Sequence, residues 1–269
     1  MTKHHSIYFS KRTGNEWYRQ LHRRAVEYLK DGYTVLYAVE TNPEHVMESL
    51  ASLDSESGNF AKNNRLVIVD RSSLYPKRDI RRYPGKPCDL IHAIFRTLRR
   101  GRRGRCVIFG MPISFTLEHL EDGLTEYESL LGSAFDDTVE LICCYNRTMF
   151  RHLSLRHLVK ILNTHQYTVH RREWNPSPWP QHRIVDFVTD GLDESLGPGS
   201  GALVLKTLKS VYRIDEHMVV ASPEIYEEKL RKLIGSSADR VIGTTAARMT
   251  DKMVFEGTDA GTLTHRTVQ

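Results

Sequence analysis

The sequence contains no apolar run that approaches the ~20 residues of a membrane-spanning helix. Its first residues, Met-Thr-Lys-His-His, lack the apolar core of a secretory signal peptide. Cysteine is scarce, with four in 269 residues: Cys88, Cys106, Cys143 and Cys144. We therefore expect a cytoplasmic protein with reduced thiols, because disulfides persist mainly in oxidising compartments.

A phosphate-binding loop is also missing. Such a loop reads Gly-x-x-x-x-Gly-Lys-Ser/Thr, so that backbone N–H groups can surround the phosphates. The stretch after the first expected strand has one glycine, Gly14, and its lysine, Lys11, comes before that glycine. The sequence therefore argues against ATP hydrolysis at a Walker-type site.

Metal-ligand spacing is absent among the 13 histidines. His152 and His157, for example, are five apart and would lie on poorly matched faces of a helix. We therefore predict no metal site and no cofactor, and we interpret most histidines as surface or core residues. His5, at the start of the first expected strand, is the exception that merits a test.

Short apolar runs alternate with amphipathic stretches over the first two thirds of the sequence. The expected strands are 5–9, 33–39, 65–70, 105–110, 140–145 and 167–171. The expected helices are 16–29, 43–53, 87–98, 117–131 and 154–162. This alternation predicts an α/β fold with a mostly parallel sheet and helices on both of its faces.

The pattern changes after residue 172. We expect a linker at 173–182, because this stretch is rich in proline, which interrupts helices and sheet ladders. We predict that residues 183–252 form a small all-helical domain and that residues 253–269 form a disordered tail. Residues 1–185 hold 28 Lys and Arg against 20 Asp and Glu, whereas the remainder holds 10 against 13. The opposite net charges favour two units.

The most informative run is Val-Glu-Leu-Ile-Cys-Cys-Tyr-Asn-Arg, at residues 139–147. A dense apolar run is typical of a strand buried on both faces, and ligands of open α/β sheets gather at the carboxyl ends of strands. The chemistry of Cys144, Tyr145 and Asn146 is therefore the first place to look for function. Cys143 and Cys144 must point to opposite faces, so one of them can face a pocket. Both could equally be small buried core residues.

Two charged segments carry competing interpretations. Six arginines between positions 96 and 105 could contact nucleic-acid phosphates. No aromatic residues interleave them, so a solvated helix end is the favoured interpretation. The acidic residues from 121 to 128 favour a solvated helix face, although Glu128 would need a partner if it were buried.

With these residues in view, residues 1–172 resemble the MEDS domain, the sensory domain of methanogen and methylotroph regulators that include a dichloromethane-responsive repressor. The matching features are His5 with Ile-Tyr-Phe at 7–9, the strand patterns at 32–37 and 66–70, Glu-Tyr-Glu at 126–128, Cys-Cys-Tyr-Asn-Arg at 143–147 and Thr-His at 164–165. The resemblance implies a RecA/KaiC-like domain that has lost its phosphate loop and senses small hydrocarbon derivatives. One departure is the apolar Gly-Met-Pro at 110–112, where family members often carry an aspartate.

Residues 183–252 resemble the small helical output domain named for Nitrosopumilus, which is found in ammonia-oxidising archaea. The matching stretches are Ile-Val-Asp-Phe at 184–187, Ser-Pro-Glu-Ile-Tyr-Glu at 222–227 and Leu-Ile-Gly at 233–235. This second resemblance implies an archaeal protein with a signalling output module.

Together these observations predict a cytoplasmic signal-transduction sensor or transcription regulator that binds a small, mostly apolar organic ligand at the carboxyl edge of the sheet. We expect no enzymatic activity and no membrane partner. A regulatory protein is the expected partner of the helical domain, and nucleic-acid contact stays open. The residues expected at the ligand are His5, Tyr8, Met111, Glu128, Cys144, Tyr145, Asn146 and His165.

Two alternatives from other functional classes stay open. The first is a degenerate KaiC/RecA-like nucleotide-binding domain without ATPase activity. The second is a thiol hydrolase in which Cys144 is the nucleophile, His165 the base and Glu128 the residue that orients the base. The hydrolase would require a depressed pKa for the Cys144 thiol.

Overall fold

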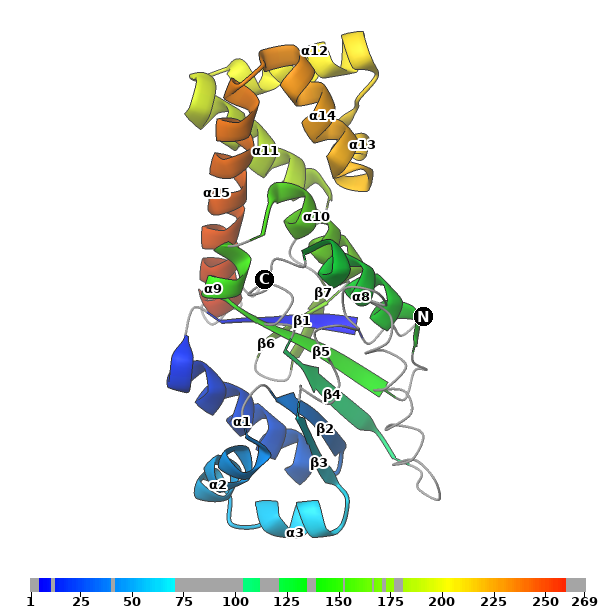
Figure 1. The fold of residues 1–269 in the computed structure, drawn as a ribbon, viewed down its shortest axis with the longest axis vertical. Coiled ribbons are helices and arrows are strands. Elements are labelled where there is room, and N and C mark those ends of the chain that lie inside the picture. Colours follow the sequence, from blue (N-terminus) through cyan, green and yellow to red (C-terminus); the bar gives the residue numbers. More distant parts are fainter. Residues whose placement is uncertain are drawn as a thin grey trace, which may run out of the picture.

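In the computed structural model, the chain forms an α/β sheet structure with a group of helices at one end (Figure 1). The structure describes residues 5–10, 13–39, 42–70, 104–111, 121–134, 139–151, 153–165, 167–170, 173–176 and 181–259. The strands are β1 (His5–Ser10), β2 (Thr34–Val39), β3 (Leu66–Asp70), β4 (Cys106–Gly110), β5 (Val139–Asn146), β6 (Tyr167–His170) and β7 (Glu173–Pro176). The helices that accompany them are α1 (Gly14–Lys30), α2 (Pro43–Leu53), α3 (Ser57–Lys62), α8 (Glu121–Ala134), α9 (Arg147–Arg151) and α10 (Leu155–Thr164).

The strands of the described ranges form one seven-stranded sheet in the order β3-β2-β4-β5-β1-β6-β7. Neighbouring strands from β3 to β6 in this order are parallel, and β7 pairs antiparallel with β6. All eight residues of β5 are buried, as expected for a strand that is covered on both faces. The mostly parallel α/β sheet predicted from the sequence is confirmed.

Helices cover both faces of the sheet. On one face, α1 buries Trp17 and Leu21, and its Gln20 side chain accepts a hydrogen bond from Tyr8 of β1. On the other face, Glu128 of α8 accepts a hydrogen bond from Cys143 of β5, and α10 packs beside α8. The centre of the sheet is therefore shielded from solvent on both sides.

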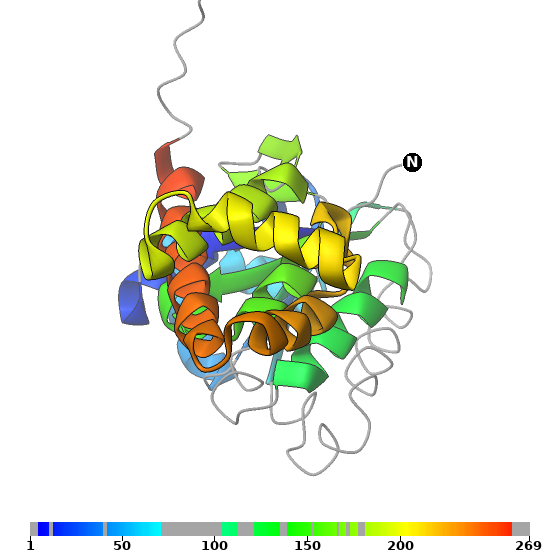
Figure 2. The ribbon, with the colours of Figure 1, turned by 90° about the horizontal axis from the view of Figure 1, so that it is seen from above.

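The helical unit, residues 181–259, lies at one end of the molecule, next to α10 and β1 (Figures 1 and 2). It consists of α11 (Gln181–Leu196), α12 (Ser200–Tyr212), α13 (Glu216–Ala221), α14 (Pro223–Ile234) and α15 (Ser237–Asp259). α15 runs back from this unit to the sheet, where it packs against β1 and α9. There Arg147 of α9 donates to Asp251 of α15 at 2.6 Å. The predicted C-terminal helical region is confirmed, and it is continuous in packing with the α/β sheet.

Three local expectations differ from the structure. Residues 173–176 of the expected linker form strand β7, which proline permits because β7 is the last strand in the described sheet order. α15 continues to Asp259, into the expected disordered tail. The short helices α3, α9 and α13 were not predicted, because five or six residues are too few to show a helical period. The expected helix at 87–98 and the arginines at 96–103 lie outside the described residues.

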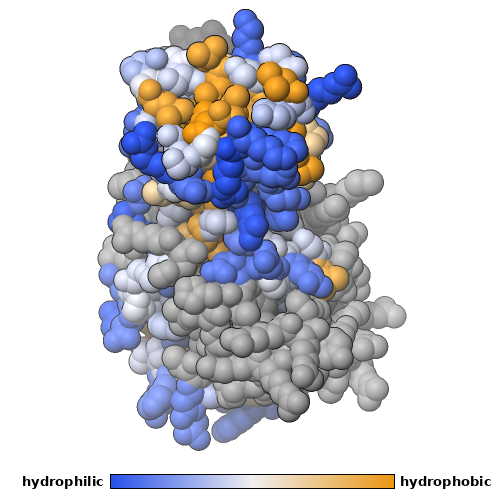
Figure 3. All heavy atoms as spheres, turned by 45° about the horizontal axis from the view of Figure 1, so that its top comes forward, coloured by the Kyte–Doolittle hydropathy of each residue, from blue (hydrophilic) through white to orange (hydrophobic). Residues whose placement is uncertain are grey.

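The surface of the helical unit carries a group of exposed apolar side chains (Figure 3). Leu203 and Val211 of α12 are 66% and 62% exposed, and Ile225 of α14 is 36% exposed. None of the helices in the described ranges has both the length and the apolar character to cross a membrane.

Candidate functional site

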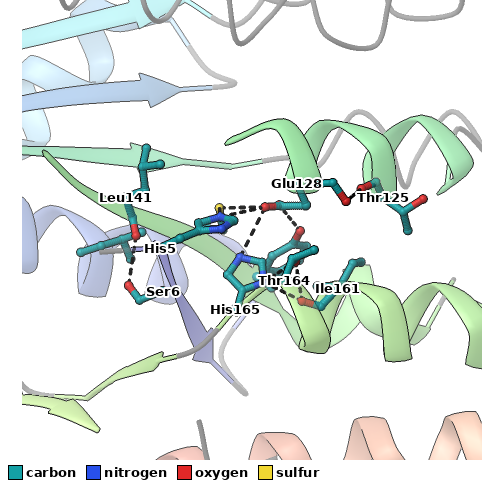
Figure 4. Close-up of polar contacts among 12 residues, drawn as sticks. His5, Ser6, Thr125, Glu128, Leu141, Ile161, Thr164 and His165 are labelled. Atoms are coloured by element: carbon teal, nitrogen blue, oxygen red, sulfur yellow. Dashed lines mark hydrogen bonds and ion pairs between the residues drawn. The ribbon is translucent and has the colours of Figure 1, made fainter. Parts of the chain in front are cut away.

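Five buried polar side chains meet on one face of the sheet, beneath α8 and α10 (Figure 4). We call them the polar cluster: His5, Glu128, Cys143, Tyr145 and His165. His5 begins β1, Cys143 and Tyr145 lie on β5, Glu128 lies on α8, and His165 follows the last residue of α10. Segments from four parts of the sequence therefore contribute to a single group.

Glu128 is the centre of the polar cluster. Its Oε2 atom lies 3.2 Å from His5 Nε2, 3.3 Å from His165 Nε2 and 3.1 Å from Cys143 Sγ. Its Oε1 atom accepts a short hydrogen bond from the hydroxyl of Tyr145. His5 Nε2 also lies 3.3 Å from Cys143 Sγ, and the two imidazole rings are 4.1 Å apart.

The Glu128 carboxyl keeps its charge despite being 0% exposed. Burial alone would raise its pKa, but His165 and His5 outweigh that effect and hold the pKa well below its usual range. Burial lowers the pKa of His5, repulsion from His165 lowers it further, and attraction to Glu128 opposes both. Burial and the nearby Glu128 carboxylate raise the pKa of Tyr145, which keeps its hydroxyl protonated as a donor. The cluster therefore contains a buried carboxylate whose stability depends on its neighbours.

The orientation of His165 is fixed from outside the cluster. Its Nδ1 atom lies 2.7 Å from the backbone carbonyl oxygen of Ile161. A carbonyl oxygen only accepts hydrogen bonds, so Nδ1 carries a proton. The other ring nitrogen, Nε2, therefore faces Glu128, and in the neutral ring that atom presents a lone pair.

The alternation of side chains along a strand explains which residues join the cluster. In β1 and β5, residues paired across the two strands point to the same face, and successive residues point to opposite faces. The register pairs His5 with Leu141 and Ile7 with Cys143, which places His5, Cys143 and Tyr145 on the face beneath α8. The same rule places Tyr8 and Cys144 on the face beneath α1.

The eight residues expected at the ligand are thus divided. Four of them, His5, Glu128, Tyr145 and His165, lie in the polar cluster. Tyr8 and Cys144 lie on the opposite face, where the Arg24 guanidinium stacks 4.5 Å from the centre of the Tyr8 ring. Burial raises the pKa of the Cys144 thiol, which is the reverse of what a thiol nucleophile needs. The expected grouping of Cys144 with Glu128 and His165 is therefore not assembled.

The other two expected residues lie near strand ends. Asn146 ends β5, and its side-chain Oδ1 accepts a hydrogen bond from the Met149 backbone N–H at 3.1 Å, which caps α9. Met111 follows the end of β4 and is buried. The polar cluster extends along one face of the sheet, from His5 at the start of β1 to Tyr145 near the carboxyl end of β5, and is not confined to the carboxyl edge where the ligand was expected.

Sequence reasoning missed Cys143. The signal was available, because Tyr145 was expected at the site and Cys143 is two residues before it on the same strand. Period-two alternation therefore groups Cys143 with Tyr145 and separates Cys144 from both. Choosing Cys144 meant treating adjacent residues as if they shared a face.

The polar cluster also contains four atoms of the kinds that bind metal ions. One atom each from His5, Glu128, Cys143 and His165 lies within 4.8 Å of all the others. The prediction of no metal site rested on spacing along the sequence, which does not register ligands drawn from separate strands and helices. These four residues span 161 positions, so no local motif could have revealed them.

One arginine of the 96–105 segment is described, and it has an intramolecular role. Arg105 donates to the buried Glu140 carboxylate at 2.5 Å, and its guanidinium stacks on the Tyr33 ring at 4.6 Å. Tyr33 donates to the same carboxylate at 2.9 Å. Arg105 therefore neutralises the buried Glu140 carboxylate near the start of β5, and its partner belongs to the same chain.

Comparison with known proteins identifies the family of the first part of the chain. No curated protein and no solved structure matches it. The family model of the MEDS domain, described as the MEthanogen/methylotroph, DcmR Sensory domain, matches residues 4–166. This match includes every member of the polar cluster and excludes the helical unit. The chain therefore belongs to the MEDS family of sensory domains.

Proposed function

We propose that this protein is a signal-transduction sensor that binds a small, mostly apolar organic ligand, with the polar cluster as the polar anchor of the binding site. The ligand would lie on the face of the sheet beneath α8 and α10, and not at the carboxyl edge where it was expected. The observation that carries it is the Glu128 carboxylate, buried at 0% exposure within the family's sensory domain.

A buried charge of this kind is weak evidence for stability. Removing a carboxylate from water costs several kcal/mol, and a well-packed apolar residue is often at least as stabilising at the same place. Perturbed titratable groups instead gather at functional sites. The surroundings of Glu128 on α8 are otherwise apolar in character, with Leu124, Tyr127 and Leu131 all buried. A mostly apolar site with a few oriented polar groups suits a small organic ligand.

The output route in this proposal is α10, which lies between the polar cluster and the helical unit. His165 follows its last residue, and at its start the Arg156 backbone N–H donates to the Glu227 side chain of α14 at 3.2 Å. Asn163 donates to the Val220 carbonyl oxygen of α13 at 3.1 Å. Lys160 pairs with Glu224 of α14 at 3.3 Å. A small displacement of α10 would therefore directly change its contacts with α13 and α14.

A ligand signals only if it prefers one of two arrangements of the protein. In the proposed mechanism, the ligand changes the contacts of Glu128 with His165, and α10 moves with His165. The helical unit then reports the change to a regulatory protein, for which the exposed apolar side chains of α12 offer a surface. That partner and the output role of the unit are part of the proposal.

Titration calorimetry with short alcohols, methylamines and halomethanes tests the ligand. The chain offers a matched pair of variants, Cys143→Ser and Cys144→Ser, because the two cysteines are adjacent, buried and on opposite faces. We expect heat of binding from at least one ligand class in the wild type and in Cys144→Ser, and a loss of at least tenfold in affinity in Cys143→Ser. Flat titrations with all three classes would count against an organic ligand. Binding of ATP in the same assay would favour the degenerate nucleotide-binding alternative.

A further inference from the structure

We infer that the polar cluster binds one divalent transition-metal ion of the zinc class. The ligands would be His5 Nε2, His165 Nε2, Cys143 Sγ and a carboxylate oxygen of Glu128. This inference goes beyond the proposed function: it concerns the same cluster, but it depends on the geometry of the four atoms and not on an organic ligand. Three features of the described residues support it: the spacing of the four atoms, the second contacts of two of the ligands, and the orientation that one of these contacts gives to His165.

Four of the six distances among the four atoms fit a tetrahedral site. With metal–nitrogen and metal–oxygen bonds of about 2.0–2.1 Å and a metal–sulfur bond of about 2.3 Å, ligand atoms of a tetrahedron lie about 3.3–3.6 Å apart. The distances from Glu128 Oε2 to His5 Nε2 and His165 Nε2 are 3.2 and 3.3 Å. The distances from Cys143 Sγ to His5 Nε2 and Glu128 Oε2 are 3.3 and 3.1 Å. The other two distances, from His165 Nε2 to His5 Nε2 and to Cys143 Sγ, are at most 4.8 Å, so the atoms already converge on one centre.

Two of the four ligands, His165 and Glu128, make the second contacts that are characteristic of metal ligands. A histidine ligand usually donates its other ring nitrogen to a carbonyl or carboxylate oxygen, and a carboxylate ligand is itself hydrogen-bonded. His165 Nδ1 donates to the Ile161 carbonyl oxygen at 2.7 Å, and Tyr145 donates to the Oε1 atom of Glu128. Both contacts leave the remaining atom, Nε2 or Oε2, directed at the shared centre.

The contact between His165 and Glu128 requires a proton or a metal ion between the two atoms. Because Nδ1 of His165 holds its proton against Ile161, a neutral ring directs the Nε2 lone pair at a carboxylate oxygen 3.3 Å away. This Nε2 atom is buried, and among the described residues it has no hydrogen-bond partner of good geometry, although the Glu128 carboxylate lies 3.3 Å away. A proton on the ring or on the carboxyl, or a metal ion, must lie between the two atoms. A proton would satisfy this one contact, whereas a metal ion satisfies all four converging atoms.

The donor set selects the class of ion. Thiolate and imidazole ligands suit zinc and neighbouring transition metals, whereas magnesium and calcium take oxygen ligands. On binding, the Cys143 thiol would lose its proton to solvent, and its sulfur would form the bond to the metal as a thiolate. Four protein ligands complete a tetrahedron, so the site would be closed and would hold α8, α10, β1 and β5 together.

Cobalt(II) substitution tests the inference, with zinc as the competing ion. Protein stripped with a chelator is titrated with Co²⁺, and the absorption of four-coordinate cobalt and its thiolate charge-transfer band are recorded. We expect one cobalt per chain in the wild type and in Cys144→Ser, displaced by one equivalent of Zn²⁺. Cys143→Ser should lose the charge-transfer band, and Tyr145→Phe should lower metal affinity about 10–100-fold through loss of the second contact.

A second measurement needs no variant. The thermal unfolding midpoint of the wild type is compared after chelation and after one equivalent of Zn²⁺, and we expect it to rise with zinc. An unchanged midpoint together with an absent thiolate band would overturn the inference, as would a band that persists in Cys143→Ser. If zinc binds and no organic ligand gives heat, the metal site stands and the organic-ligand proposal fails. If organic-ligand binding depends on Cys143 and no metal binds, the organic-ligand proposal stands and the metal site fails.

Discussion

Replacing Gly191 with alanine tests how closely the long helix α15 is held in the helical unit. A Cβ atom at position 191 of α11 would lie 2.0 Å from Thr245 Oγ1, 3.0 Å from Thr245 Cβ and 3.1 Å from Thr245 Cα on α15. Rotation of the threonine side chain would relieve the first contact. The other two involve atoms that do not move when the side chain rotates, so α11 and α15 would have to shift apart.

Gly243→Ala is a matched control, because Gly243 also lies on α15 and a Cβ there would meet nothing within 4 Å. Alanine is favoured over glycine within a helix by about 0.8–1 kcal/mol. Overpacking a tight contact costs about 1–3 kcal/mol, which exceeds that gain at position 191. We therefore expect the free energy of unfolding to rise by about 0.5–1 kcal/mol in Gly243→Ala and to fall by about 1–2 kcal/mol in Gly191→Ala.

Urea unfolding followed by the helical circular dichroism signal measures both effects. The slope of the transition should stay the same, so that a change in midpoint reports stability. The same sign of change in both variants would refute the reasoning, because it would mean that α11 and α15 do not approach closely at this point.

Burial lowers the pKa of His22, beside Ser49, from 6.5 to about 4, so the folded state disfavours its protonation. The resulting loss of free energy of unfolding is absent above the unfolded pKa of 6.5. It grows as pH falls from 6.5 towards 4 and reaches about 2 kcal/mol at about pH 5. Urea midpoints should fall less between pH 8 and pH 5 in His22→Gln than in the wild type, and equal falls would contradict this. Asp215→Ala removes the side chain that caps α13 through the Met218 N–H at 2.9 Å, and we expect a loss of about 1 kcal/mol in urea unfolding. Arg147→Ala breaks a partly exposed ion pair, and a loss above about 1 kcal/mol in the same assay would contradict its surface character.

The sequence was sufficient for most elements of the sheet and its helices. The helix at 43–53 begins and ends where it was expected, because proline lies at its first position. Each described strand from β1 to β6 was expected to within one residue at either end, because parallel strands form dense apolar runs. Strand β7 was missed because prolines mask a short edge strand that pairs only on one side.

The candidate site was predictable in part, since the MEDS resemblance pointed to His5, Glu128 and His165. The sequence could not indicate how deeply the Glu128 side chain is buried. Glu128 lies on a helix among other acidic residues, and nothing in that pattern distinguishes a buried carboxylate from a solvated one. The packing of α8 and α10 over β5 decides this, and it depends on contacts between residues far apart in the sequence. The face of Cys143, by contrast, followed from strand geometry alone.

Hydrogen exchange of α13 and α14 in a Glu128→Gln variant tests the central claim most directly. The claim is that the state of the polar cluster is transmitted through α10 to the helical unit. We predict faster amide exchange in α10, α13 and α14 than in the wild type, with no change in α2 and β3 on the far side of the sheet. Exchange that changes in α8 and α10 but not in α13 or α14 would contradict the claim.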